Sequence, residues 1–244
     1  MNKLLLIQNY LFYTGFISEI IPLIFCILFF KKLNTKALKV FFIYTCVLCV
    51  FSVLSIVALK LLQEKTLYLL LVKIYNILEF SVISLFLYNL FKNEIIKKIV
   101  LYVIIPFVVI SIVDYLINDK TKFNNHSNLA SSFLLIIYII YYFYEKMKTV
   151  VMYPLYQSIS FWICVGFFLN FTGTFFFILF IKSSTDKEFK ILMNTIYGVV
   201  TITKNILLCL SLFASEYLET NDDTLHIPSE IDLDEFSLAN LKNP

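Results

Sequence analysis

Apolar positions along this chain are gathered into long, almost uninterrupted stretches, and short lysine-rich connections separate them. A helix needs about 20 mostly apolar residues to cross a bilayer. Seven stretches reach or approach that length, so the pattern predicts an all-α polytopic membrane protein, a seven-transmembrane-helix bundle. We place the spans at residues 10–30, 37–62, 66–91, 99–117, 128–144, 158–181 and 189–213.

Two of these spans need comment. The fifth is short and begins with polar residues, so its full crossing stays open. The first is too apolar over too long a stretch for a signal peptide. Glu19 interrupts it and no small-residue cleavage site follows, so we interpret it as a retained span. The domain organisation is then a transmembrane domain over residues 1–213 and an acidic, disordered cytoplasmic tail over 214–244.

Composition agrees with a membrane protein. Hydrophobic residues make up 60% of the chain and charged residues only 15%, against about a quarter in soluble domains. The excess apolar surface must face lipid. A formal net charge of +3 is too small to favour nucleic acid, and every basic residue is a lysine, so bidentate arginine recognition of phosphate is not available. The five cysteines lie inside apolar runs and are interpreted as buried side chains.

The distribution of lysines predicts the orientation of the chain. The first connection carries four lysines and no acid, and the first helix usually dominates the choice. We therefore expect the N-terminus outside and the acidic tail in the cytoplasm, in a bacterial cytoplasmic membrane. The lysines expected inside are Lys31, Lys32, Lys36, Lys39, Lys92, Lys97, Lys98, Lys146 and Lys148.

The seventh span contains a lysine, Lys204, which is costly in hydrocarbon. At 100° per residue, Asn194, Tyr197, Thr201 and Lys204 share one face of the helix, and Asn205 lies beside it. Lipid offers these groups no hydrogen-bond partners, so the face must point into the bundle or a wet cavity.

Carboxylates in other spans are the expected partners of this lysine. Glu79 in the third span is the first choice, because both spans run in the same direction and the two residues reach a similar depth. Glu19 in the first span is the second choice. Lys73 and Asn76 share a broad face with Glu79, so they join the predicted ligand or ion-pair pocket. Lys73 and Asp114 are expected nearer the outer surface.

Four interpretations of Lys204 remain open at this point: a structural ion pair or water-reaching lysine, a ligand or signal-sensing pocket, a proton or ion relay, and a covalent Schiff base. Small and polar residues on the sixth span, Gly166, Asn170 and Gly173, are interpreted as helix packing.

The chain lacks common sequence signatures of enzymes. The chain has two histidines, both outside the spans, and neither H-E-x-x-H nor G-x-S-x-G occurs. With four glycines, a phosphate-cradling loop is not expected. We therefore expect no enzymatic activity, no cofactor and no bound metal.

Two resemblances bear on function. A carboxylate in the third span and a lysine in the seventh resemble microbial rhodopsins in topology, which implies retinal binding as a minor alternative; Val200 and the single Trp162 depart from that family's pattern. The stretches "FWICVGFFLNFTGTFFFILF" and "TKNILLCLSLF" resemble the small bacterial seven-transmembrane sensory modules associated with histidine kinases. This second resemblance implies signal input through the membrane.

The acidic tail mixes carboxylates with apolar residues that suit docking on a cytoplasmic or membrane protein partner. The candidate docking residues are Ile231, Leu233, Phe236 and Leu238. The sequence thus favours a receptor-like or regulatory membrane protein that signals through a separate partner. A small transporter or ion-coupled carrier and a scaffold subunit of a membrane complex are the alternatives.

Overall fold

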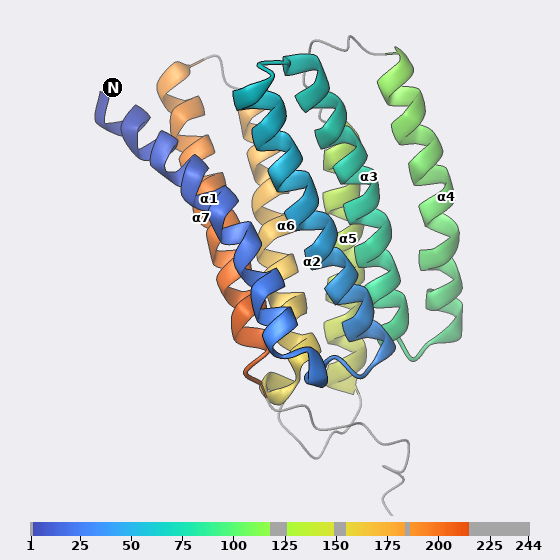
Figure 1. Ribbon diagram of the computed structural model, residues 1–244. Coiled ribbons are helices and arrows are strands. Elements are labelled where there is room, and N and C mark those ends of the chain that lie inside the picture. Colours follow the sequence, from blue (N-terminus) through green and yellow to red (C-terminus); the bar gives the residue numbers. More distant parts are fainter. Residues whose placement is uncertain (1, 118–125, 149–154, 184–185, 215–244) are drawn as a thin grey trace, which may run out of the picture.

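The computed structural model describes residues 2–117, 126–148, 155–183 and 186–214. The described chain is helical and contains no strand. Most of the predicted acidic tail, including the four candidate docking residues, lies outside the described residues. Figure 1 shows the helices running side by side along one common direction. They are α1 (Asn2–Leu28), α2 (Lys36–Ile56), α3 (Lys65–Leu90), α4 (Glu94–Ile117), α5 (His126–Lys148), α6 (Ile159–Ser183) and α7 (Lys187–Ser211).

Six of the described helices, α2 to α7, are long and apolar enough to cross a membrane. In α1 the described apolar part, Tyr13–Leu28, is shorter than a full crossing. The prediction of an all-helical fold is therefore confirmed for the described residues, and six of the helices have the length and composition of membrane spans, while the predicted count of seven spans stays a prediction. Short helical turns complete the connections: η1 (Phe30–Lys32) and η3 (Leu155–Gln157) are 3-10 turns, and η2 (Val57–Leu61) is a π-helical turn that continues α2.

Several helices extend further than their apolar stretches. α4 begins at Glu94, earlier than the predicted start at residue 99, because the Asn93 side chain caps it and accepts a hydrogen bond from the Ile95 amide at 2.9 Å. α5 covers 23 residues from His126 to Lys148, so the helix extends beyond the predicted span 128–144 at both ends. α7 begins after Asp186, whose carboxylate accepts from the Glu188 amide. Capping and backbone hydrogen bonding continue in water, where hydropathy gives no signal.

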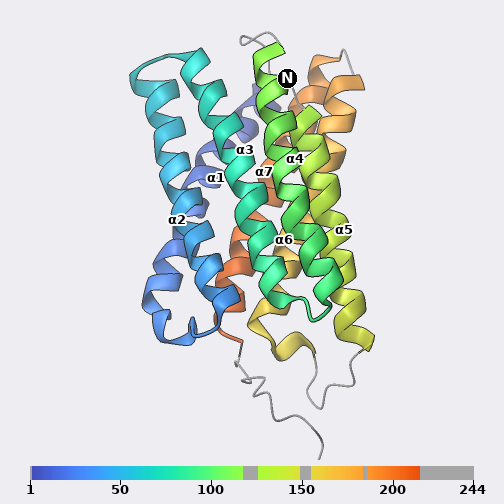
Figure 2. The same ribbon diagram turned by 90° about the vertical axis from the view of Figure 1, so that its right-hand side faces the viewer.

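The helices form a ring with one helix outside it. α1 packs against α2 and α7, α2 against α3, α3 against α5, α5 against α6, and α6 against α7. The first and last helices thus meet and close the ring, and Figure 1 shows α1 tilted away from α2 toward its N-terminal end. α4 packs on α3 and α5 from outside, and Figure 2 shows it in front of the bundle. Its side chains are mostly exposed, which suits a lipid-facing position.

Along the bundle axis, one half of the interior is filled by aromatic side chains. Phe41 and Tyr44 of α2, Phe86 of α3 and Phe167 of α6 are each no more than 1% exposed. Their rings pack pairwise, with Tyr44 and Phe167 edge to face at 5.0 Å between centroids and Phe86 and Phe167 edge to face at 6.0 Å. We call these four residues the aromatic cluster. It seals the half of the bundle in which α2 begins and α3 ends.

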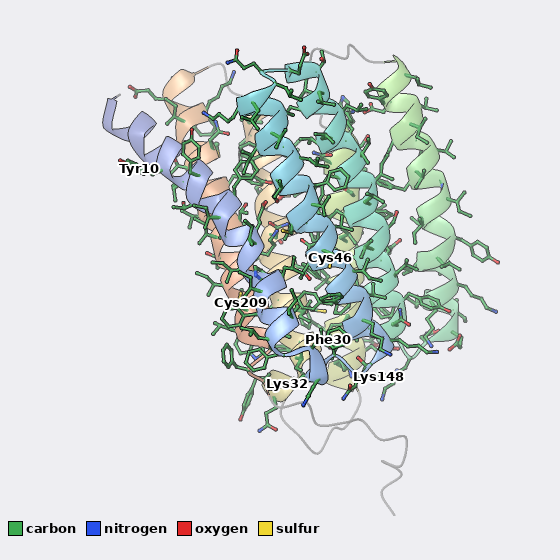
Figure 3. All side chains as sticks on the ribbon, in the orientation of Figure 1. Tyr10, Phe30, Lys32, Cys46, Lys148 and Cys209 are labelled. Atoms are coloured by element: carbon green, nitrogen blue, oxygen red, sulfur yellow. The ribbon has the colours of Figure 1, made fainter. Side chains whose placement is uncertain are left out.

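The same end of the bundle collects the lysines predicted to lie inside. Figure 3 shows Lys32, after α1, and Lys148, at the end of α5, near one end of the molecule, while Tyr10 lies toward the other. Lys32 Nζ donates to the Leu212 carbonyl at 3.0 Å, so a lysine from the first connection caps the end of α7.

Two glycines on α6 differ in how closely α7 approaches them. A Cβ added at Gly173 would lie 2.7 Å from Val200 Cγ1, whereas one added at Gly166 would meet nothing closer than 3.4 Å. Val200 is β-branched and cannot swing away easily. Asn170 lies between the two glycines and is buried.

We expect Gly173→Ala to lower the free energy of unfolding by about 1–3 kcal/mol, because the methyl group must push α6 and α7 apart. The matched control is Gly166→Ala, which should cost clearly less. Unfolding in detergent can be followed through the thiols of Cys26, Cys164 and Cys209, which are buried in the fold. Equal losses in the two variants would contradict close packing at Gly173.

Candidate functional site

A cavity of about 570 Å³ lies inside the ring, in the half of the bundle along its axis that the aromatic cluster does not fill. Six helices, α1, α2, α3, α5, α6 and α7, contribute to its wall, and α4 contributes none of the lining residues. Glu79 and Lys204 lie at its deep end, and Ile181 of α6 and Asn194 of α7 lie at the opposite end. The cavity therefore runs from mid-bundle toward the end at which α6 is followed by α7.

The polar face predicted on α7 lies along this cavity. Asn194, Tyr197, Thr201 and Lys204 are all on its wall, at the helical spacing that places them on one side of α7. Lys204 is only 3% exposed. Asn205 does not line the cavity; its Nδ2 donates to Ser18 Oγ at 2.8 Å and so ties α7 to α1.

The lysine and its first-choice carboxylate are joined through a tyrosine. Lys204 Nζ donates to Tyr44 Oη at 3.5 Å, and Tyr44 Oη donates to Glu79 Oε1 at 3.3 Å. Tyr75 Oη also donates to Glu79 Oε1, at 2.8 Å. No direct ion pair joins Lys204 to a carboxylate among the described residues. Four residues from α2, α3 and α7 thus form one chain of polar groups at mid-depth.

The second-choice carboxylate, Glu19, lies on the same cavity wall but has different partners. Its Oε2 accepts a hydrogen bond from Ser52 Oγ on α2. Ser52 Oγ is also placed to donate to the Leu48 carbonyl at 2.7 Å. A hydroxyl group has a single proton to donate, so Glu19 and Leu48 compete for it. Glu19 therefore has at most one shared donor within the described structure.

Asn76 lies on the cavity wall from α3 and is 6% exposed. Its Oδ1 accepts from Ser131 Oγ of α5 at 3.0 Å. Its Nδ2 has no hydrogen-bond partner among the described residues. A buried amide N–H without an acceptor is costly, so this group is available to an acceptor in the cavity.

Lys73, like Asn205, is a predicted pocket residue that does not line the cavity. Its Nζ pairs with Asp114 Oδ2 of α4 at 2.8 Å, and Ser127 Oγ of α5 donates to the same oxygen at 3.1 Å. Lys73 is not among the residues that line the cavity. On a helical wheel Lys73 shares only a broad face with Glu79, and the carboxylate of α4 holds it toward the outside of the ring.

Three partners of the charged residues were missed in the sequence. Tyr75 lies four residues before Glu79, the spacing at which two side chains meet on one helix face, so this contact was open to prediction. Ser52 is one of several small polar residues of the second span and carries no local signal that distinguishes binding from packing. Tyr44 meets Lys204 only through the packing of α2 against the distant α7.

The arrangement can hold a charged or polar molecule at mid-depth, because it offers two carboxylates, an ammonium group and an amide without a full set of partners. It can also pass a proton along the chain of hydroxyl and carboxylate groups. Within the described residues no three histidine, cysteine or acidic side chains gather as a metal site would require. Comparison with protein-family models, with curated proteins and with solved structures finds no match for this chain.

Proposed function

We propose that this chain is a receptor-like membrane protein of seven spans that binds a small ligand in the cavity and passes the change to a separate protein partner. The observation that carries the proposal is the cavity itself. It has charged residues from α1, α3 and α7 on its wall, and the aromatic cluster fills the other half of the ring. A bundle with a cavity in one half and packed aromatic side chains in the other suits a protein that takes up a ligand from one side of the membrane.

The seventh span of the proposal is α1. As a helix of 27 residues it is about 40 Å long at 1.5 Å per residue, more than the roughly 30 Å of a hydrocarbon core. The first connection, with four lysines and no acid, supports an orientation with that end of the bundle in the cytoplasm. The cavity then faces outward, in a bacterial cytoplasmic membrane, and α7 leads to the acidic tail on the inner side.

A ligand changes the state of such a protein only if it binds two arrangements unequally. A molecule that contacts both Glu19 and Asn76 would draw on α1 and α3 together. α1 is also held to α7 by the contact of Asn205 with Ser18. Because α7 carries Lys204 and leads to the tail, a shift of α7 on ligand binding would pass the signal to the tail. We propose that the tail, through Ile231, Leu233, Phe236 and Leu238, contacts the partner.

A carrier is the second candidate, and the chain from Lys204 through Tyr44 to Glu79 favours it, because such groups can relay a proton. A carrier would have to open the aromatic cluster during its cycle. A scaffold subunit would need no access to the cavity at all. Access from each side of the membrane therefore separates the three functions.

We expect Ser55→Cys, on the cavity wall, to react with a membrane-impermeant thiosulfonate reagent added outside cells at least about tenfold faster than Ser84→Cys, because modification of a thiol requires access to it. Ser84 is the matched control, since it is fully buried and does not line the cavity. The measurement is the labelling rate on intact cells and on inverted vesicles, with the wild-type chain as background.

Labelling from outside alone supports the receptor. Comparable labelling of Ser55→Cys from the inside of energised vesicles would favour the carrier. Rates for Ser55→Cys that match those for Ser84→Cys from both sides would overturn the proposal and favour a scaffold.

A further inference from the structure

The charged groups on the cavity wall are not balanced. Glu19 and Glu79 contribute two carboxylates, while Lys204 is the ammonium group among the lining residues. Lys204 is linked to Glu79 through Tyr44, and Glu79 receives a second donor from Tyr75. The wall therefore carries one carboxylate more than it has ammonium groups. The charge of Lys204 acts on both Glu19 and Glu79, and Glu79 has more hydrogen-bond donors.

Glu19 has fewer hydrogen-bond donors than Glu79 and shares the one positive charge of Lys204 with it. Its one donor is the hydroxyl proton of Ser52, for which the Leu48 carbonyl competes. A carboxylate inside a membrane protein gains most from a partner that brings both N–H donors and positive charge. An ammonium group has three donors and a full positive charge, and it fits both needs.

The walls around this carboxylate suit an organic cation. Phe16, Phe51, Tyr68 and Tyr197 line the same cavity, and the faces of such rings attract ammonium groups. The volume of about 570 Å³ falls in the range of cavities that enclose small organic ligands. A hydrated inorganic ion would leave most of this apolar wall unused.

A second group on the wall, the Asn76 amide, indicates that the ligand carries an oxygen acceptor. Asn76 Nδ2 is buried and has no acceptor among the described residues, although Oδ1 of the same side chain is held by Ser131. A hydroxyl or carbonyl oxygen some distance from the ammonium group would satisfy it.

We infer that the cavity binds a small organic amine with an aromatic or aliphatic body, its ammonium group on Glu19. This inference rests on the proposed function and names the chemical class of its ligand. An oxygen acceptor in the body of the ligand adds a contact with Asn76. The opposite charges of Glu79 and Lys204 then offset each other at the deep end of the cavity, and neither residue binds the ammonium group.

The test uses four probes of similar size with the purified full chain in lipid nanodiscs. They are 2-phenylethylamine, 2-phenylethanol, 3-phenylpropionate and the zwitterion phenylalanine, and binding is measured by titration calorimetry. We expect the amine to bind about tenfold or more tightly than the alcohol, because the charge-assisted contact is made by the amine alone.

Glu19→Gln should remove that preference, and Glu19→Asp, which keeps the charge, should retain part of it. Glu64→Gln is the matched control, because Glu64 is an exposed carboxylate that does not line the cavity. The control should bind the amine as tightly as the wild type does.

Equal binding of the four probes, tighter binding of 3-phenylpropionate or phenylalanine, or a preference for the amine that survives Glu19→Gln would each overturn the inference. None of these results would remove the cavity as a ligand site. Absence of binding by every probe also overturns the amine class, and the labelling of Ser55→Cys then decides separately whether the proposed function stands.

Discussion

Replacing Lys204 with methionine is expected to lower the free energy of unfolding by roughly 3 kcal/mol, because it leaves buried carboxylates without their positive neighbour. Glu79→Gln alone should also destabilise, since it removes a negative charge that lies near the buried Lys204. In the double variant neither charge remains, and we expect recovery of about 1–2 kcal/mol relative to the sum of the single changes. The measurement is equilibrium unfolding in mixed micelles, with the buried thiols as reporters.

The structure adds a sharper version of this cycle. Lys204 and Glu79 are joined through the Tyr44 hydroxyl, so the coupling between them should shrink when the cycle is repeated in a Tyr44→Phe background. Lys190→Met, near the start of α7, is the control for loss of a lysine from the same helix, and it should change stability little. If the effects of the two single changes simply add in the wild-type background, the charges are not coupled. If the coupling energy is the same in the Tyr44→Phe background, the tyrosine is not the link between them.

Truncating Phe167 to alanine is expected to destabilise the fold by about 3 kcal/mol, because this side chain packs at the centre of the aromatic cluster. Phe167 is 1% exposed and contacts both Tyr44 and Phe86 edge to face. Its loss leaves a void beside Tyr44, the residue to which Lys204 donates a hydrogen bond. We therefore also expect the cavity to extend toward the lysine-rich end, and Ser55→Cys to become accessible to reagent from the inside.

The matched control for this change is Phe180→Ala on the same helix. Phe180 is 48% exposed on the outside of α6, where lipid takes the place of protein contacts. Its truncation should cost much less and should leave the labelling of Ser55→Cys one-sided. A similar loss of stability in both variants would contradict a closed aromatic floor beneath the cavity.

The membrane architecture could be predicted from sequence because hydropathy is a local property. The ends of α4 and α5 could not, since caps such as Asn93 act in water and leave no mark in an apolar pattern. The polar face of α7 was predictable from helical periodicity, and its residues from Asn194 to Lys204 do share one wall. Lys73 and Asp114 were both expected nearer the outer surface, but their ion pair was not predicted, because it depends on how α4 packs against α3.

Tyr44 illustrates the harder part of the problem. It lies in an ordinary apolar stretch of the second span, and only the contacts between helices bring its hydroxyl between Lys204 and Glu79. Lysine and glutamate in two spans are conspicuous because each is costly in lipid. A tyrosine is not conspicuous in this way, so its role depends on tertiary packing that no single stretch of sequence encodes.

The closure of the ring by α1 and α7 sets an order for biosynthesis. Ribosomes deliver the helices from first to last, so Glu19 and Glu79 enter the membrane before Lys204 has been made. Until α7 arrives, the nascent bundle has an open seam between α1 and α6, and its two carboxylates lack their basic neighbour. A chain that stops before α7 would expose that seam to membrane proteases, and completion of translation itself would be the step that closes the bundle.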